Sequence, residues 1–292
     1  MSETLFHRII HKLSRKVDPK APRLAPPAAN DSHGGEYPPI FVIGCQRSGT
    51  SLVRRILDSH SRIACPGESN FILPLVGVLQ DKRSMRGLDS MGFERSRVGA
   101  SLAQFVDGFF TTYAKSQGKP RWADKTPHYI DCLPQLAELF PQARFVVISR
   151  HGLDVAYSLA NPHWHFPAID PFVAQADGDK PVGAGLYWVE RSEKIESFYQ
   201  VNPDKCYRIR YEELTSNPER SLRPLFGFLE EAWEPEVMQY DRFPHHSGYG
   251  DAEVRRHRTI KQNSQRHLEW PVEVQKRVRD VCAPMLVRLG YE

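Results

Sequence analysis

The chain has 292 residues, of which 40% are hydrophobic and 25% are charged, so it has the length and composition of a folded globular protein rather than a disordered one. Its formal net charge of +4 arises in the first 24 residues, where six Lys and Arg face two acidic residues. The balanced remainder argues against a nucleic-acid groove. Five cysteines without a CxxC pair argue against a zinc site or a disulfide framework, and we expect a cytoplasmic protein that needs no metal ion.

The N-terminal residues 1–37 are predicted to form a basic amphipathic segment followed by a linker. Apolar residues between Leu5 and Val17 share one helical face, with basic side chains around the others. Such a helix either packs on its own domain or, as a peripheral contact through residues 4–17, touches a membrane surface. Pro, Ala and Gly dominate the following linker. No apolar run of 18 residues occurs in the sequence, so no transmembrane segment is predicted.

Residues 38–292 are predicted to form the folded domain. Short apolar runs at residues 40–43 (IFVI), 144–148 (RFVVI) and 206–211 (CYRIRY) are typical of buried parallel strands. Helical spacing follows the first strand and is expected again over residues 133–140, 185–199, 222–229 and 274–289, the last interrupted at Pro284. Alternating strands and helices predict an α/β fold of three layers, a central parallel sheet flanked by helices.

The loop after the first strand has the spacing of a P-loop. Residues 44–51 (GCQRSGTS) place two glycines five positions apart, followed by two small hydroxyl residues. Backbone N–H groups at the start of the next helix would bind an anion there. The lysine that P-loop ATPases and GTPases carry after the second glycine is Thr50 here, and the cation is Arg47 inside the loop. This pattern favours a short anion over a triphosphate with Mg²⁺.

A second anion site is predicted at the end of the second strand. Arg150 follows that strand at the edge of the sheet where open α/β folds bind ligands. Ser158 lies eight residues later, about two helical turns on, and would face the same ligand. A guanidinium and a hydroxyl around one phosphate form a sound binding arrangement.

Together the two sites resemble those of the sulfotransferases that use 3′-phosphoadenosine 5′-phosphosulfate (PAPS), and most closely the tyrosylprotein sulfotransferase branch with its bacterial relatives. The resemblance runs from about Pro39 to the C-terminus and implies a P-loop-like fold and PAPS as the cofactor, with adenosine 3′,5′-bisphosphate as its product. It is carried by residues 47–51 (RSGTS, where that branch has RSGTT), 67–68 (GE), 125–127 (KTP), 139–141 (LFP), 211–214 (YEEL), 283–286 (APML) and 289–291 (LGY).

The resemblance also implies roles for individual residues. Glu68, 21 residues after Arg47, matches the family's catalytic base, and Arg47 and Lys125 match its catalytic cations. His128 is the alternative base, because the small-molecule branch uses a histidine shortly after its lysine. The implied cofactor-binding residues are Arg47, Ser48, Gly49, Thr50, Ser51, Arg150, Ser158, Tyr211 and Lys261.

One position departs from the family pattern. The related enzymes carry an arginine four residues after the serine of the second site, and this chain has Pro162 there. The 3′-phosphate site would then be completed by His163 or Arg256, or bind more weakly. Residues 161–182 are either an acceptor-binding lid or an ordinary surface segment.

The expected activity is in-line sulfuryl transfer from PAPS to a hydroxyl acceptor with Glu68 as general base. The acceptor is left open among a peptide tyrosine, a carbohydrate, a lipid and a small molecule. A P-loop kinase, or a nucleotide-binding module without sulfuryl transfer, is the alternative. The missing P-loop lysine counts against the kinase.

Overall fold

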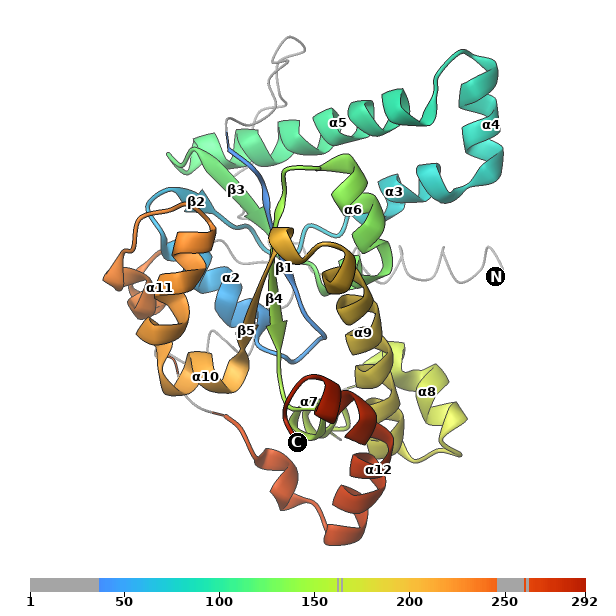
Figure 1. Ribbon diagram of the computed structural model, residues 1–292, viewed down its shortest axis with the longest axis vertical. Helices are drawn as coiled ribbons and strands as arrows, with labels where there is room; N and C mark the ends of the chain where they lie inside the picture. Colours follow the sequence, from blue (N-terminus) through green and yellow to red (C-terminus); the bar gives the residue numbers. More distant parts are fainter. Residues whose placement is uncertain (1–36, 162, 164, 246–259, 261–262) are drawn as a thin grey trace.

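In the computed structural model, residues 37–161, 163, 165–245, 260 and 263–292 are described (Figure 1). The predicted N-terminal helix, most of its linker, Pro162, Arg256 and Lys261 therefore lie outside the described residues. None of the described helices is long and apolar enough to cross a bilayer.

A five-stranded parallel sheet forms the centre of the fold. Its strands are β1 (Ile40–Ile43), β2 (Ile63–Ala64), β3 (Arg121–Asp124), β4 (Arg144–Ser149) and β5 (Cys206–Arg210), in the order β2-β3-β1-β4-β5. Strand β1 lies between β3 and β4, with Ile40 opposite both Ala123 and Arg144. All four of its apolar residues are buried, as expected for a parallel strand covered on both faces.

Helices cover both faces of this sheet (Figure 1). The helices are α2 (Thr50–Ser59), α3 (Ile72–Gln80), α4 (Lys82–Ser90), α5 (Arg95–Ser116), α6 (Leu133–Leu139), α7 (Gly152–Leu159), α8 (Asp170–Gln175), α9 (Lys180–Val201), α10 (Tyr211–Ser216), α11 (Pro218–Phe228) and α12 (Val272–Arg288). On one face, Phe41, Phe145 and Trp122 pack with side chains from α3, α5, α6 and α9. On the other, Val42 and Val146 pack with side chains from α2, α10 and α11.

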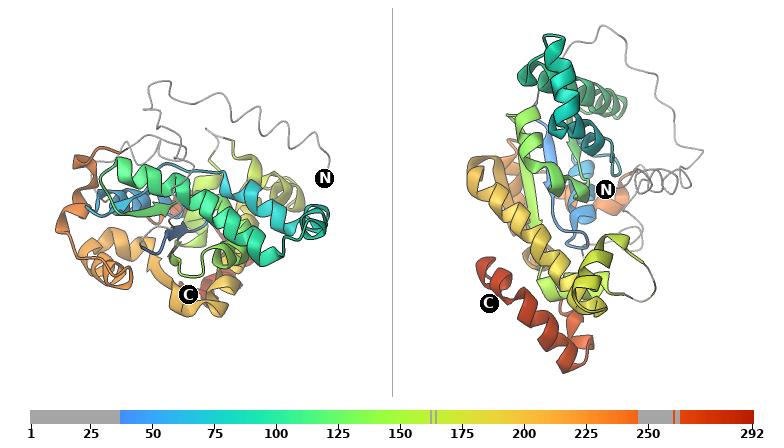
Figure 2. Two further views of the ribbon diagram at one scale, coloured as in Figure 1. Left: turned by 90° about the horizontal axis from the view of Figure 1, so that it is seen from above. Right: turned by 90° about the vertical axis from the view of Figure 1, so that its right-hand side faces the viewer.

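The molecule extends beyond the sheet at two ends (Figure 2). Helices α4 and α5 project at one end, and α7, α8, α9 and α12 form a separate apolar cluster at the other. The 3-10 helix η1 (Pro127–Cys132) follows β3 directly. The three-layer α/β prediction is therefore confirmed.

The predicted elements agree with the structure except in detail. The strand predicted over residues 206–211 ends at Arg210, because Tyr211 begins α10. The predicted interruption of the last helix is wrong, since α12 runs from Val272 to Arg288 with Pro284 inside it. Its neighbours Cys282, Met285 and Leu286 are buried against α9 and α7. This packing offsets the backbone hydrogen bond that a proline removes.

Candidate active site

The candidate site residues lie where parallel strands end, at one edge of the sheet. The P-loop follows β1, and Lys125 follows β3. Arg150 follows β4, and Tyr211 follows β5. The loop with Glu68 comes shortly after β2. Because all five strands are parallel, their carboxyl ends share this edge, where open α/β sheets bind ligands.

The P-loop approaches its neighbours too closely for side chains at its two glycines. A Cβ atom on Gly44 would lie 2.7 Å from the carbonyl oxygen of Ile148. Gly49 has φ of +96°, and a Cβ there would lie 2.5 Å from the ring of Tyr211. Arg47 also adopts a positive φ, 71°, which non-glycine residues rarely do. The loop is thus held in an uncommon conformation directly before α2, whose N-terminal backbone N–H groups are suited to an anion.

Arg47 and Ser158 meet, although they come from the two separately predicted anion sites. Arg47 Nε donates a hydrogen bond to Ser158 Oγ at 2.8 Å. Ser158 lies near the end of α7, the helix that follows β4. The structure therefore joins the P-loop cation to the second predicted site.

Arg150 is buried, with 7% of its surface exposed, beside the P-loop. Its Nη1 donates to the carbonyl oxygen of Arg47 at 2.9 Å, and its Nη2 donates to the carbonyl of Asn263. Its guanidinium carbon lies 4.5 Å from the centre of the Tyr211 ring. Its Nε is buried and has no hydrogen-bond partner among the described residues. A buried donor without an acceptor costs free energy. Arg150 Nε can therefore donate one further hydrogen bond, for example to a bound anion.

Lys125 and Glu68 form a close ion pair on the other side of the P-loop. Lys125 Nζ donates to Glu68 Oε1 at 2.6 Å and lies 3.3 Å from Ser51 Oγ. The lysine is fully buried, whereas Glu68 is 15% exposed. A buried cation therefore stands at the P-loop with a partly accessible carboxylate beside it, the arrangement in which an approaching hydroxyl can meet a base.

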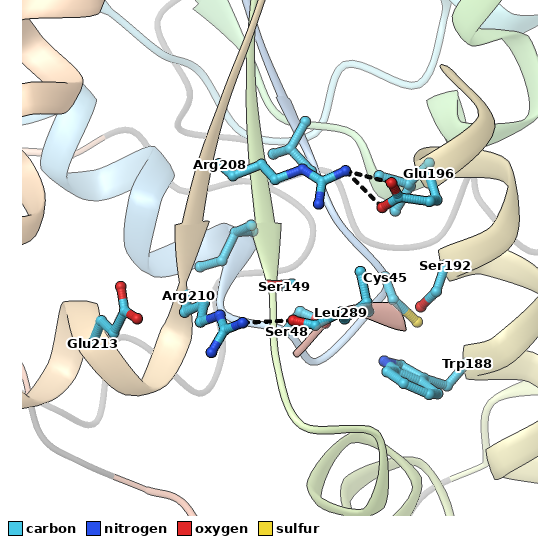
Figure 3. Close-up of a pocket in the computed structure, with 13 residues that line it drawn as sticks. Cys45, Ser48, Ser149, Trp188, Ser192, Glu196, Arg208, Arg210, Glu213 and Leu289 are labelled. Carbon is cyan, nitrogen blue, oxygen red and sulfur yellow. Dashed lines mark hydrogen bonds and ion pairs between the residues drawn. The ribbon is translucent and has the colours of Figure 1, made fainter. Parts of the chain in front are cut away.

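Ser48 is the P-loop residue whose side chain lies apart from these groups. Its buried Oγ, which lacks a hydrogen-bond partner among the described residues, lines a cavity of about 180 Å³ with Trp188, Arg210 and Leu289 (Figure 3). Its backbone N–H donates to the carbonyl of Cys45 at 3.1 Å. Neither Arg47 nor Lys125 lines this cavity.

The remaining predicted residues are either exposed on the surface or lie outside the described residues. His128, the alternative base, is exposed in η1. His163 is exposed as well. Lys261 and Arg256 lie outside the described residues. Within the part of the chain that the structure describes, no group of three or more His, Cys, Asp or Glu side chains is arranged to hold a metal ion.

A family model matches most of the chain. The model described as "Sulfotransferase family" covers residues 38–235. The chain belongs to the sulfotransferase family.

Among its relatives are protein-tyrosine sulfotransferases of animals. Protein-tyrosine sulfotransferase 1 of Danio rerio is 27% identical over 268 residues, which cover 88% of this chain and 73% of the zebrafish protein. Protein-tyrosine sulfotransferase of Drosophila melanogaster is 27% identical over 276 residues, 89% of this chain and 53% of the fly protein. An uncharacterized protein of Aquifex aeolicus is 29% identical, but its matching part is 26% of its length. This sulfotransferase therefore spans between a quarter and three quarters of these relatives.

The fold of this sulfotransferase is shared with solved bacterial enzyme domains. The sulfotransferase domain from the curacin biosynthetic pathway superposes with a TM-score of 0.61 at 20% identity, covering 88% of this chain and 98% of the domain. The sulfotransferase domain of the Synechococcus PCC 7002 olefin synthase gives 0.56 at 20% identity, covering 90% and 98%. The P-loop-like prediction for the fold is thus confirmed.

Two features near the site were not predicted from the sequence. Asp154 in α7 accepts hydrogen bonds from the backbone N–H of Gln265 at 2.7 Å and from His267 Nδ1 at 2.9 Å. These bonds hold the segment before α12 against α7 and bring the Asn263 carbonyl to Arg150. The other feature is Asp124, which is fully buried at the end of β3 next to Lys125.

Asp124 makes the stability of this sulfotransferase depend on pH. Burial raises the pKa of Asp124 to about 6, although the hydrogen bond from Ser69 acts in the opposite direction. A carboxyl with a raised folded-state pKa stabilises the fold at low pH and loses that contribution as pH rises through about 6. Between about pH 4 and pH 7 we expect the wild type to lose about 2 kcal/mol of unfolding free energy relative to Asp124→Asn. Urea unfolding of both proteins across this pH range measures the difference in unfolding free energy. Unfolding free energies that change in parallel with pH in the two proteins would contradict the prediction.

Proposed function

We propose that this sulfotransferase transfers the sulfuryl group of PAPS to a hydroxyl acceptor, with Glu68 as the general base. The observation that carries the proposal is the 2.6 Å contact between buried Lys125 and Glu68, beside a P-loop whose own cation is Arg47. The relatives that match along 88% or more of the chain are named for sulfation of protein tyrosine, which makes a tyrosine hydroxyl the first acceptor to test. A carbohydrate, lipid or small-molecule hydroxyl remains the alternative.

The residues present fit the anionic parts of PAPS. Gly44 and Gly49 leave a backbone cradle that a Cβ would fill, suited to the 5′-phosphosulfate. Arg150, with its buried and unpartnered Nε, suits the 3′-phosphate. Tyr211, packed against Arg150, supplies an aromatic wall. Lys261 is proposed to contact the cofactor as well, although it lies outside the described residues.

The chemistry follows from these positions. PAPS supplies a sulfuryl group whose bond to the phosphate oxygen breaks as the acceptor oxygen bonds to sulfur. Glu68 takes the proton of the acceptor hydroxyl, so that the bond forms to a more nucleophilic oxygen. Arg47 and Lys125 stabilise the negative charge that develops on the phosphate oxygen when the S–O bond breaks. Positioning and charge stabilisation are the main contributions in such loose transition states.

A P-loop kinase or a nucleotide-binding module is the competing proposal. Thr50 stands where a P-loop kinase has its phosphate-binding lysine, and Lys125 and Glu68 would have no role in a module that only binds. Calorimetric titration with adenosine 3′,5′-bisphosphate, against ATP with and without Mg²⁺, separates sulfuryl transfer from the kinase, whereas the binding module is separated by its lack of turnover. We expect binding of the bisphosphate without Mg²⁺ and little binding of ATP. Preference for Mg²⁺-ATP would overturn the proposal.

Arg150→Ala is expected to weaken binding of the bisphosphate at least tenfold, because one buried, charge-assisted phosphate contact contributes about 1.5–3 kcal/mol. Arg144→Ala is the matched control. It lies at the other end of the same strand, β4, where its guanidinium pairs with Glu230 at 2.6 Å. Titration of both variants measures the effect. Equal affinity in the two variants would remove Arg150 from the nucleotide site.

A further inference from the structure

The loop that carries Glu68 is tied to the end of β3 by three successive residues. Lys125 Nζ donates to Glu68 Oε1 at 2.6 Å. Thr126 Oγ1 accepts from the backbone N–H of Ser69 at 3.2 Å. Ser69 Oγ in turn donates to Asp124 Oδ2 at 2.7 Å. Residues 68 and 69 are therefore held at three points by residues 124–126.

When Asp124 is ionised, the hydrogen-bond donors in this cluster leave one consistent arrangement. The single hydroxyl proton of Ser69 goes to Asp124, so the 2.6 Å contact between Ser69 Oγ and Tyr129 Oη must be donated by the tyrosine. Thr126 Oγ1 lies 3.4 Å from Asp124 Oδ1 and donates to it. Ser69 and Thr126 thus donate to the ionised carboxylate directly, and Tyr129 donates to Ser69, because an ionised carboxylate accepts and never donates. The direction of the network is set by Asp124.

The next residue of the loop is also fixed. Asn70 adopts a positive φ of 57°, and its side-chain amide donates to the carbonyl oxygen of Glu68 at 3.2 Å. Asparagine tolerates this conformation better than most residues. The backbone on both sides of Ser69 is therefore constrained, and Glu68 has little freedom to move except by its own side-chain torsions.

Fold stability does not account for a carboxylate at this place. Asp124 is fully buried, and its burial disfavours the ionised form. The groups that face it are Ser69, Tyr129, Thr126 and Lys125, and the thiol of Cys65 lies near enough to feel its charge. An apolar core at such a site, with the hydroxyls that face Asp124 replaced as well, would usually be neutral or stabilising. A costly buried carboxylate whose hydrogen bonds end next to a candidate base fits a functional role.

We propose that Asp124, acting through Ser69 and Tyr129, is a positioning residue that holds the Glu68 carboxylate toward the acceptor hydroxyl. Without the hydrogen bonds of Ser69, only the ion pair with Lys125 would fix the orientation of the Glu68 carboxylate. In the proposed function, Lys125 also has to stabilise negative charge on the phosphosulfate. The inference rests on the proposed function of Glu68 as the base. Asp124, Ser69 and Tyr129 contact neither the acceptor nor PAPS in the proposed function, and would act only through Glu68.

The first test separates positioning from folding. Ser69→Ala and Tyr129→Phe each remove one link and are expected to lower kcat about 10- to 100-fold, since misplacing a catalytic group by about 1 Å has effects of this size. Affinity for adenosine 3′,5′-bisphosphate should not change, because neither Ser69 nor Tyr129 contacts Arg47 or Arg150. Ser69→Thr keeps the hydroxyl and is expected to restore most of kcat.

Asp107→Asn is the matched control. Asp107 in α5 is also a buried carboxylate. It accepts a hydrogen bond at 2.8 Å from Nε1 of Trp122, which lies in β3 two residues before Asp124. We expect this variant to lower thermal stability without lowering kcat. If Ser69→Ala keeps full kcat, or if Asp107→Asn loses as much kcat as Ser69→Ala, the positioning role is wrong.

A second measurement does not depend on turnover. Crystal structures of the wild type and of Ser69→Ala are expected to show the Glu68 carboxylate displaced in the variant while Arg47 and Arg150 stay in place. An unmoved Glu68 would overturn the positioning role even in an active enzyme. If the folded wild type transfers no sulfuryl group, the proposed function fails instead, and the same two structures still decide whether Ser69 positions Glu68.

Discussion

Glu68→Gln is expected to lower kcat for sulfuryl transfer by about 10²–10⁴-fold, the usual contribution of a general base. Glutamine keeps the size of the side chain and its hydrogen bond with Lys125, but it cannot take the proton of the acceptor. Affinity for adenosine 3′,5′-bisphosphate should stay unchanged, because the P-loop and Arg150 are untouched. Steady-state kinetics with PAPS, alongside calorimetry, measures both quantities.

His128→Ala is the informative comparison for this base assignment. His128 is exposed in η1, whereas Glu68 is partly buried in the ion pair with Lys125. We expect the His128 variant to retain most of its activity. Activity that survives Glu68→Gln and disappears in His128→Ala would show that the histidine is the base.

Lys125→Met is expected to lower kcat by about 10²–10³-fold, as removal of a preorganised donor at the site of developing charge usually does. The lysine is fully buried and contacts both Glu68 and Ser51, so methionine fills its volume while removing its charge. Single-turnover rates with bound PAPS would report this loss directly, because they exclude effects on product release.

Two comparisons make the lysine result specific. Lys119→Met removes a lysine that is partly rather than fully buried, and whose Nζ donates to the backbone carbonyls of Asp58 and Ile63 rather than to a site residue. We expect this control to keep its rate of transfer. Because Lys125 and Glu68 act as a pair, their double variant should lose less than the product of the two single losses. Multiplicative losses would mean that the residues act independently.

The central part of the fold and site was predictable because it depends on local sequence. The apolar run of β1 and the two glycines after it define a strand and a P-loop without reference to other segments. Arg150 could be placed at the carboxyl edge for the same reason, since a buried strand directly precedes it. The hydrogen bond between Arg47 and Ser158 was not predictable, because it depends on how α7 packs beside the P-loop.

Other elements lack a local signal. Strand β3 has only four residues with a charge at each end (RWAD), so neither alternation nor an apolar run marks it. In α5, exposed Phe105 and Phe109 stand beside buried Val106 and Phe110, which blurs the helical pattern. The Asp124 network joins residues 69, 124 and 129, and such contacts appear only after folding. The domain boundary at residues 37 and 38 and the role of Lys261 stay predictions.

The central claim is tested most directly by incubating the full chain with sulfur-radiolabelled PAPS and a panel of hydroxyl acceptors, beginning with a tyrosine-containing peptide. Labelled acceptor and adenosine 3′,5′-bisphosphate would be quantified together. We predict that the two products form in equal amounts without added metal ion, and that Glu68→Gln forms almost none. Bisphosphate binding without label on any acceptor would support a nucleotide-binding module, and phosphate transfer from Mg²⁺-ATP would support a kinase. Either result would contradict sulfuryl transfer by this site.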